Sequence, residues 1–291
     1  MANFASIFIN GILTGGLYAL IALPIVMVYK ATQVVSIAHG QLLALGAFLF
    51  WLMFHWVPFV PALLISLALV ALLGFIIERF ALRPLIGQPL FSTFLVTFGI
   101  FMFIDGIYQL LLAGKARGIA ALFPSSLQIA GTTVIVNDIW IFFASIAVFL
   151  LVWLFFRYSK LGLGMRATAE EHKLAQSVGI NVRVIFSLTW IFSAAIAAFA
   201  GIAAAQVVSV YISLPWIIIK GLVVALVGGL DSMRGALIAG LLLGVMERLA
   251  AVYIDPLVGG GTAEVVPFVL LLLIVLVRPY GLFGLERIER I

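Results

Sequence analysis

The feature that most constrains this sequence is a succession of apolar runs, each about as long as a bilayer is thick. A helix needs about 20 predominantly apolar residues to cross a hydrocarbon core of about 30 Å. By that measure there are roughly nine candidate spans: 6–29, 34–56, 59–77, 90–113, 138–156, 184–209, 216–230, 235–253 and 264–278. The seventh is short and contains Lys220, so it suggests a broken or re-entrant segment. Eight full spans with one partial element is the alternative count.

The composition supports a membrane protein. Of the 291 residues, 65% are apolar and only 9% are charged, whereas about 25% are charged in a typical soluble domain. So few charges cannot cover a water-facing surface, and no stretch is polar enough to form a soluble domain. The first run, Ile7 to Tyr29, is too long for a signal-peptide core and lacks a preceding basic stretch, so we expect a retained span. The sequence predicts one all-α integral membrane domain over residues 1–291, a bundle of about eight to nine transmembrane helices.

The distribution of basic residues predicts the orientation of the chain. The net charge of +5 does not indicate nucleic-acid binding, because the basic residues lie between apolar runs rather than in one patch. If the N-terminus is outside, the inward loops hold 12 of the 16 basic residues: Lys30, Arg79, Arg83, Arg157, Lys160, Arg166, Lys173, Arg183, Arg234, Arg278, Arg287 and Arg290. The opposite orientation would put almost all of this charge outside. We therefore expect the N-terminus outside and the C-terminus in the cytoplasm.

Several kinds of chemistry are excluded or unsupported. The sequence has no cysteine, which excludes disulfides and thiolate metal sites. It has no G-x-S-x-G motif, and no histidine has another His, Asp or Glu three or four residues away, the helical spacing of a metal site. Ser36 and His39 would have the residue types of a catalytic dyad, but residues three apart on one helix meet often by chance. We therefore expect neither an enzyme nor a metal or cofactor.

The loop at 158–183 is the most polar part of the chain. Arg166 to Val178 is rich in good helix formers and predicts a helix that ends at Gly179. Ala167, Leu174 and Val178 fall on one face of this helix, at spacings of seven and four. Two interpretations stay open: a docking element for a soluble partner, or a solvated interfacial helix that only connects two spans.

Polar side chains inside apolar spans mark either a transport path or a bonded contact between helices. Asn10, Thr14 and Tyr18 recur every four residues on one side of the first span, a pattern that suits a path or close helix packing. Asp105 suggests proton coupling or a bound cation, or equally a neutral acid or one bonded to a neighbouring helix. Lys220 either snorkels to an interface or offers its charge to an anionic substrate group. The candidates for a translocation path are Asn10, Thr14, Tyr18, His39, Gln41, Asp105 and Gln206.

Six blocks, in order along nearly the whole chain, resemble one known family. They are Gly16-Leu17-Tyr18-Ala19-Leu20; Ala38-His39-Gly40-Gln41 with Leu45-Gly46-Ala47; Glu78-Arg79-Phe80 with Arg83-Pro84-Leu85; Gly164-Met165-Arg166-Ala167 with Leu174-Ala175 and Val178-Gly179-Ile180-Asn181; Gly228-Gly229-Leu230 with Gly235-Ala236 and Gly240-Leu241-Leu242-Leu243-Gly244; and Arg278-Pro279-Tyr280-Gly281-Leu282-Phe283-Gly284. In residues and order these blocks resemble the branched-chain amino-acid ABC permeases of the LivH/LivM type.

The resemblance implies the permease subunit of an ATP-driven importer of branched-chain or related amino acids in a bacterial inner membrane. Its implied partners are a second, similar permease, two ATP-binding subunits and a periplasmic substrate-binding protein. The loop at 158–183 would carry the coupling helix. Its ATPase-coupling residues would be Arg166, Ala167, Glu170, Glu171, His172, Lys173, Leu174 and Gly179. The chain lacks the G-x-x-x-x-G-K-[ST] motif, as a permease separate from its ATPase should.

One departure from the family bears on the substrate, and one rival function stays open. Gln41 stands where the family usually has an acidic residue, so the substrate is open between amino acids, urea, amides and aromatic acids. The rival is a secondary transporter driven by an ion gradient, which would use Asp105 as its coupling group and would need no docking helix.

Overall fold

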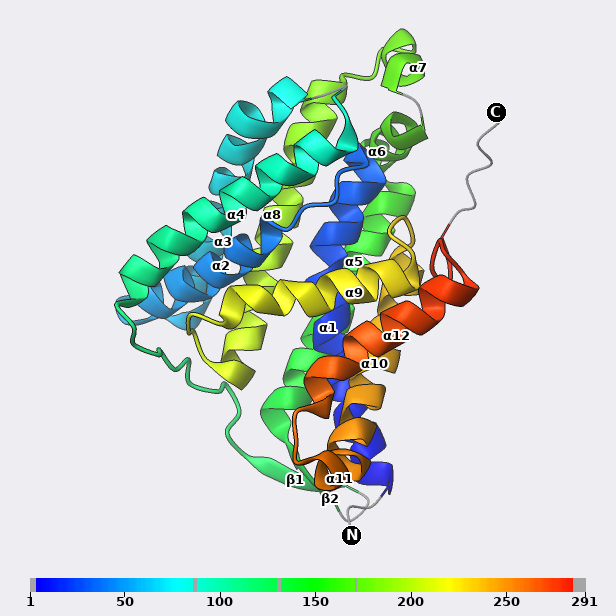
Figure 1. Ribbon diagram of the computed structural model, residues 1–291. Coiled ribbons are helices and arrows are strands. Elements are labelled where there is room, and N and C mark those ends of the chain that lie inside the picture. The colour runs from blue at the N-terminus through cyan, green and yellow to red at the C-terminus, as the bar shows by residue number, and fades with distance from the viewer. Residues whose placement is uncertain (1–3, 86–87, 130–131, 171, 285–291) are drawn as a thin grey trace. The chain divides into compact units, whose positions relative to one another are not determined.

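The computed structural model describes residues 4–85, 88–129, 132–170 and 172–284, and the chain in these ranges is mostly helical (Figure 1). It divides into two compact units. Unit 1 comprises Met1–Val26, Ala121–Ala147 and Lys220–Ile291, and unit 2 comprises Met27–Ala120 and Val148–Ile219. Both units are assembled from segments far apart in the sequence, so neither is a separate stretch of chain.

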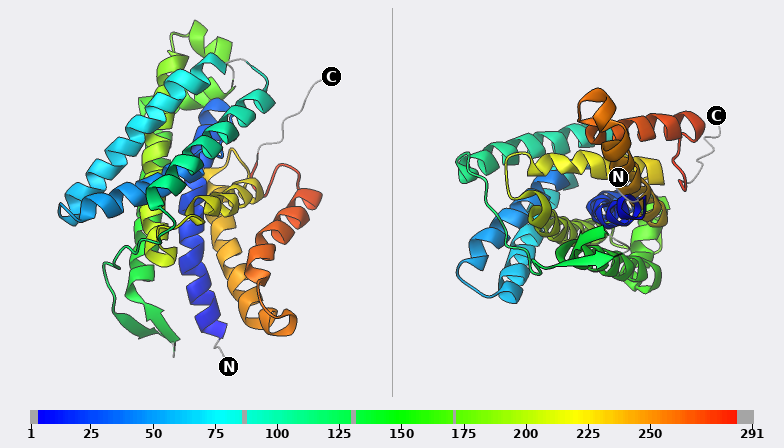
Figure 2. Two further views of the ribbon diagram at one scale, coloured as in Figure 1. Left: turned by 60° about the vertical axis from the view of Figure 1, so that its left-hand side comes forward. Right: turned by 90° about the horizontal axis from the view of Figure 1, so that it is seen from below.

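Unit 2 is organised around α8 (Val182–Val208), against which α2 (His39–Phe54) and α3 (Phe59–Ile77) pack (Figures 1 and 2). Unit 2 also contains α4 (Leu90–Leu112), α6 (Lys160–Glu170), α7 (His172–Ser177), the π-helix η1 (Glu78–Leu82) and the 3₁₀ turns η2 (Arg83–Leu85) and η3 (Leu214–Ile217). Of these, α4 packs on α2, and α6 packs on α8.

Small residues allow the central helices of unit 2 to approach one another closely. Gly46 of α2 lies against Ala198 of α8, and Gly201 of α8 lies against the backbone carbonyl of Leu43, where any Cβ would overlap it. Lipid tails are as apolar as the side chains, so no hydrophobic effect drives transmembrane helices together, and close van der Waals packing has to hold them. The glycines of α2 and α8 therefore determine how tightly this pair packs.

Unit 1 contains most of α1 (Phe4–Thr32), the start of α5 (Val136–Tyr158), most of α9 (Ile218–Gly228), and α10 (Met233–Tyr253), α11 (Asp255–Val258) and α12 (Thr262–Val277). Glycines bring α1 and α10 together: a Cβ at Gly15 would lie 2.6 Å from Leu241 Cα, and Gly244 packs on the backbone of Gly11. The glycine-bearing side of the first span is therefore a packing face.

The predicted spans coincide with helices, but only some of these helices are long. Six have the length and apolar composition to cross a membrane: Phe4–Thr32, Phe59–Leu85, Phe91–Leu112, Val136–Tyr158, Val182–Val208 and Met233–Tyr253. Three described apolar helices are shorter, namely His39–Phe54, Leu214–Gly228 and Thr262–Val277. The seventh predicted span is one of these three, in agreement with the short segment expected around Lys220.

The second span begins later than the sequence suggested. Residues 34–56 were expected to form one helix, whereas α2 starts at His39. Gln33 adopts a left-handed backbone conformation, with φ of 59°, directly after α1 ends. A non-glycine residue in this region interrupts a helix, so the chain leaves α1 at Gln33 and Val34–Ala38 form a connecting segment.

The long connection between α4 and α5 contains a β-hairpin that the sequence analysis did not foresee. Its strands are β1 (Ser126–Ile129) and β2 (Thr132–Ile135), paired antiparallel with Ser126 opposite Ile135 and Leu127 opposite Val134. Thr and β-branched residues at these positions favour extended structure. The all-α prediction therefore holds for the membrane segments but not for this loop.

The connection between α10 and α12 is fixed by one carboxylate. The Thr262 backbone N–H donates a 2.8 Å hydrogen bond to Asp255 Oδ1, and the Thr262 hydroxyl donates to the same oxygen. These hydrogen bonds hold the pKa of the Asp255 carboxyl below its ordinary value, because they stabilise its charged form. Asp255 thus satisfies free N–H and O–H groups at the start of α12.

We expect the Gly201→Val variant to lose stability, because its side chain would overlap the Leu43 carbonyl and force α2 away from α8. Overpacking of this kind typically costs about 1–3 kcal/mol. The matched control is Gly106→Val on α4, where a Cβ would meet nothing within 4 Å. Thermal unfolding in detergent, followed by tryptophan fluorescence, measures both. Equal unfolding temperatures for the two variants would contradict the role given to Gly201.

Candidate functional site

The loop at 158–183 contains two described helical segments, one on each side of Glu171, where a helix was expected over Arg166 to Val178. The first, α6, begins already at Lys160 and ends at Glu170, and the second, α7, spans His172–Ser177. Glu171 lies outside the described residues, and the structure describes only the backbone of His172 and Lys173. The predicted helical character is confirmed for the described residues on both sides of Glu171.

The end of α7 has the geometry that the sequence predicted. Gly179 has φ of 84°, which favours glycine. Its N–H donates to the Gln176 carbonyl at 3.0 Å, and the Ile180 N–H donates to the Ala175 carbonyl at 3.0 Å. This pair of hydrogen bonds is a Schellman motif, which closes the helix by satisfying its last carbonyls. Ala175 is buried against Val182 and Phe186 of α8, so the turn fixes α7 on the base of α8.

The residues of this loop divide into an inward and an outward set. Met165 and Thr168 are buried, and the Arg166 guanidinium donates to the backbone carbonyl of Phe156 at the end of α5. In contrast, the side chains of Leu174 and Val178 are 66% and 74% exposed. The outward set also includes Glu170 and Gly179, while Ala167 is half-buried. Arg166 is therefore hydrogen-bonded to the end of α5, whereas Leu174 and Val178 of the loop are exposed.

His39 occupies a closed polar site in unit 2. The ring is fully buried, with Nδ1 at 3.0 Å from Ser36 Oγ and Nε2 at 2.9 Å from Ser193 Oγ of α8. The indole of Trp190 packs beside it, with ring centroids 4.8 Å apart. Both ring nitrogens thus have hydroxyl partners, which is how a buried histidine satisfies its hydrogen-bonding groups. This arrangement joins α2 to α8.

Asp105 is bonded to a neighbouring helix, one of the alternatives left open by the sequence. The Gln41 side-chain amide of α2 donates to Asp105 Oδ1 at 2.6 Å, and the Gln109 amide donates to Oδ2 at 2.6 Å. No basic side chain among the described residues lies within 4.0 Å of this carboxylate. Gln41 is fully buried, and its Oε1 has no hydrogen-bond partner in the described part of the chain.

The remaining path candidates behave differently from one another. Asn10, Thr14 and Gln206 all bond to backbone carbonyls of their own helices, at 3.0, 2.9 and 3.5 Å. Tyr18 instead reaches across unit 1, where its hydroxyl donates to Glu247 Oε2 at 2.5 Å. Of the three polar residues on the first span, Tyr18 is the one whose side chain hydrogen-bonds to another helix in the described part of the chain.

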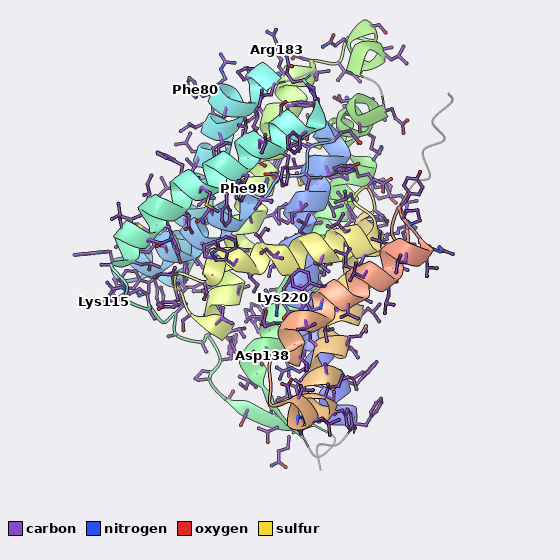
Figure 3. All side chains as sticks on the ribbon, in the orientation of Figure 1. Phe80, Phe98, Lys115, Asp138, Arg183 and Lys220 are labelled. Atoms are coloured by element: carbon purple, nitrogen blue, oxygen red, sulfur yellow. The ribbon has the colours of Figure 1, made fainter. Side chains whose placement is uncertain are left out.

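Glu247 belongs to an ion cluster that sequence reasoning missed. Lys220 Nζ, on α9 (Figure 3), lies 3.1 Å from Glu247 Oε1 on α10 and 3.1 Å from Glu264 Oε1 on α12. The ammonium also lies 5.7 Å from the centre of the Tyr18 ring. The sequence analysis singled out Lys220 but not the two acids. An acidic residue within the predicted span 235–253 was the signal available for Glu247.

A second missed contact ties the C-terminal end of α3 to α8. Arg83 donates from Nε to Glu78 Oε1 at 3.1 Å and from Nη2 to Glu78 Oε2 at 2.9 Å. The Ser187 hydroxyl of α8 lies between them, 2.7 Å from Glu78 Oε2 and 2.6 Å from Arg83 Nη2. Glu78 is fully buried. Arg83, which the sequence analysis used for topology and in a family block, is thus half of a bidentate ion pair.

Taken together, the helices and the polar contacts buried among them define a polytopic helical membrane protein. A sequence profile described as "Branched-chain amino acid transport system / permease component" matches residues 7–277, and the chain belongs to this family of transport permeases.

Similar proteins carry names that agree with the family. The chain is 29% identical to the high-affinity branched-chain amino acid transport system permease protein LivH of Salmonella typhimurium, over 97% of this chain and 96% of that protein. It is 30% identical to the corresponding permease protein BraD of Pseudomonas aeruginosa, with the same coverage. A probable LivH of Methanocaldococcus jannaschii is 27% identical over 95% of this chain and 91% of its own length. No solved structure matches the chain.

We expect Glu78→Gln to destabilise the protein by about 3 kcal/mol, because it leaves the Arg83 guanidinium without its carboxylate in a largely buried site. Replacing both residues by Met should recover most of this loss, since apolar side chains remove both charges together. Arg79→Gln is the control: Arg79 is exposed one residue further along, and its loss should change stability by less than about 0.5 kcal/mol. Thermal unfolding measures all three. A Glu78→Gln variant as stable as the control would show that the pair contributes little.

Proposed function

We propose that this chain is the membrane-spanning permease subunit of an ATP-driven importer, and that it provides the path for branched-chain or related amino acids delivered by a periplasmic binding protein. Its partners would be ATP-binding subunits and a second permease, in a bacterial inner membrane. The observation that carries the proposal is the family match over residues 7–277. The relatives named as branched-chain amino acid permease proteins support it across almost their whole lengths.

The geometry of the loop at 158–183 supports an ATPase-coupling role. A coupling helix has to expose side chains to a soluble subunit and also be joined firmly to the membrane helices. Leu174 and Val178 are exposed apolar residues next to the exposed acid Glu170, while Ala175 packs on the base of α8. Exposed apolar side chains rimmed by charge are typical of a protein-binding surface.

For the arrangement in the membrane, we infer eight to nine crossing helices, with the N-terminus outside and the C-terminus in the cytoplasm. The three shorter apolar helices would complete the six long ones, in part as partial spans. The inference is supported by the basic residues of the inward loops.

For the path itself, the candidates remain the seven residues named from the sequence. The side chains of Tyr18, His39, Gln41 and Asp105 hydrogen-bond to other helices. Asn10, Thr14 and Gln206 bond within their own helices.

We expect charge reversal at Glu170 and Glu171 to uncouple transport from ATP hydrolysis. The test reconstitutes the chain with the ATPase and binding protein encoded beside it and follows uptake of radiolabelled leucine, urea, a short amide and an aromatic acid. The double Glu→Lys variant should reduce leucine uptake at least about tenfold while ATP hydrolysis continues, since one repulsive contact in an interface costs about 1.4 kcal/mol or more. Lys115→Glu, an exposed reversal in the connection between α4 and α5, is the control and should leave uptake unchanged.

The same assay distinguishes the rival functions. If the chain transports alone, driven by a proton gradient, and this transport is lost in Asp105→Asn, the protein is a secondary transporter and the importer proposal is wrong. Specific uptake of urea, an amide or an aromatic acid in place of leucine would keep the importer and change its substrate.

The topology has a direct test, because the chain contains no cysteine that would react in the background. We expect Lys115→Cys to react with a membrane-impermeant maleimide added outside intact cells. Ser177→Cys on α7 should react only after the membrane is opened. Labelling of Ser177→Cys in intact cells would reverse the proposed orientation.

A further inference from the structure

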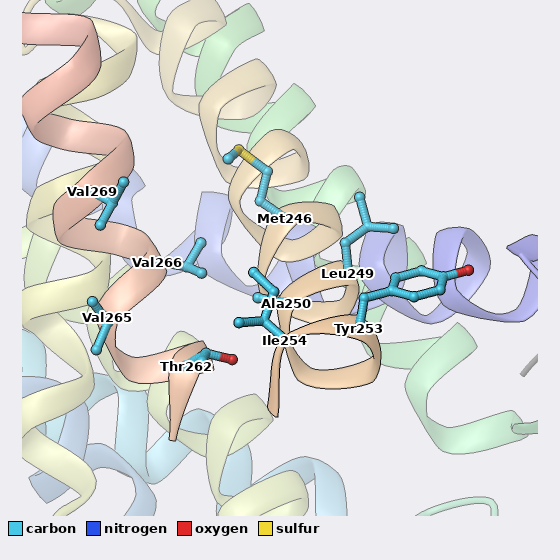
Figure 4. Close-up of a pocket in the computed structure, with 9 residues that line it drawn as sticks. All are labelled: Met246, Leu249, Ala250, Tyr253, Ile254, Thr262, Val265, Val266 and Val269. Carbon is cyan, nitrogen blue, oxygen red and sulfur yellow. The ribbon is translucent and has the colours of Figure 1, made fainter. Parts of the chain in front are cut away.

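An apolar pocket of about 520 Å³ lies between α10 and α12 within unit 1 (Figure 4). On one side its lining runs from Met246 to Ile254 at the end of α10, and on the other side from Thr262 to Val269 of α12. In both stretches the lining residues recur at the spacing i, i+3, i+4 and i+7, which places them on one face of their helix. At 1.5 Å per residue, the two stretches are about 10–12 Å long. The pocket is therefore elongated along the helices.

The walls of the pocket are short or stiff side chains. Ala250, which is 3% exposed, contributes only a methyl group to the wall on α10. The wall on α12 includes Val265, Val266 and Val269. Valine is β-branched and has one strongly preferred rotamer in a helix. These side chains have little freedom to rotate into the space, so the pocket persists as long as the two helices keep their positions.

The lining excludes three kinds of occupant. None of the nine lining residues is charged, so an amino acid would bury its carboxylate and its ammonium there without partners. Water does not fill a cavity with apolar walls. A helix with its side chains is about 10–12 Å thick, so that one turn occupies about 500 Å³. The pocket is two helical turns long, and its volume is too small for a helix of that length.

The two ends of the pocket differ in polarity. Helix α10 is one of the helices that are long and apolar enough to cross a membrane. The two hydroxyl groups of the lining belong to Tyr253, the last residue of α10, and Thr262, the first residue of α12. Tyrosine is enriched at the interface between membrane and water. This end of the pocket therefore lies at the level of the interface, and Met246 and Val269 lie deeper.

We propose that this pocket binds one acyl chain of a membrane phospholipid. The acyl chain would lie along α10 and α12, with the lipid head group beside Tyr253 and Thr262. An acyl chain is a single flexible file of methylene groups, so it fits an elongated apolar space that a helix does not. The surrounding lipid is as apolar as the pocket, so the preference for the site comes from van der Waals contacts with walls on both sides. The bound chain completes the packing between the two helices.

The first test measures the lipid that the purified chain retains. The full chain is reconstituted with dioleoyl phosphatidylethanolamine, extracted in a mild detergent and analysed by native mass spectrometry. Wild type should retain one phospholipid per chain. In Val269→Trp, retention should fall at least about tenfold, because the indole displaces several methylene groups and their contacts. Val275→Trp is the matched control, since Val275 is 41% exposed on the same helix, compared with 46% for Val269, and does not line the pocket. Equal retention by the two variants would overturn the proposal.

The second test needs no substitution, so it gives an answer even if Val269→Trp does not fold. A phospholipid with a photoreactive diazirine on one acyl chain is incorporated and activated, and the attachment sites are mapped by peptide mass spectrometry. Attachment should concentrate at 246–254 and 262–269. Leu272 and Leu276, which are 64% and 80% exposed on α12, report the lipid that merely surrounds the protein. Equal attachment at these leucines and in the pocket would contradict a bound chain.

The assembled transporter provides the remaining outcome. If attachment in the pocket is lost when the chain is assembled with its partner subunits, a partner covers the pocket and the proposal is wrong. The proposal does not depend on the transported substrate. Absence of ATP-dependent leucine uptake would contradict the proposed function, whereas it would not change the sites at which the lipid attaches.

Discussion

The hydrocarbon core of a bilayer offers no hydrogen-bonding partner, and this condition shapes both units of the protein. Each membrane segment is a helix, because a helix satisfies its backbone groups internally. Hydroxyl side chains follow the same rule: Thr14, Ser145 and Thr189 all donate to carbonyls four residues earlier in their own helices. Larger polar groups find partners on other helices, as Gln41 does with Asp105 and Tyr18 with Glu247. The polar residues inside the membrane segments are therefore satisfied either within their own helix or by a contact that connects two helices.

These helices are held together by close van der Waals packing rather than by the hydrophobic effect. In both units, glycines allow this close packing. In unit 2, Gly46 and Gly201 bring α2 against α8, and in unit 1, Gly15 and Gly244 bring α1 against α10. Backbone contact of this kind is specific, since a single methyl group is enough to disrupt it. It also places side chains accurately. His39 and Ser193 meet at hydrogen-bond distance because the backbones of α2 and α8 are already in contact.

The sequence allowed the elements to be predicted, but few of the contacts between them. The third predicted span, 59–77, coincides with α3, and Gly179 ends its helix as expected, because apolar length and helix-ending glycine are local properties. Lys220, Glu247 and Glu264 lie on three helices, and hydropathy does not tell which helices are neighbours. Glu78 and Arg83 were missed for another reason: residues five apart do not share a face of an α-helix. They meet where the chain forms the π-helix η1, which no propensity scale indicates.

The turn at Gly179 has a mechanical consequence. Two hydrogen bonds close the turn, and Ala175 packs on Val182 and Phe186, which follow the turn at the start of α8. The junction between α7 and α8 is therefore rigid. Helix α8 has 27 residues, which makes it a rod about 40 Å long. A tilt of about 5° at the base of such a rod displaces its far end by about 3.5 Å, roughly the thickness of one layer of atoms. A small displacement of α7 that tilts α8 would thus produce a larger displacement at the far end of α8.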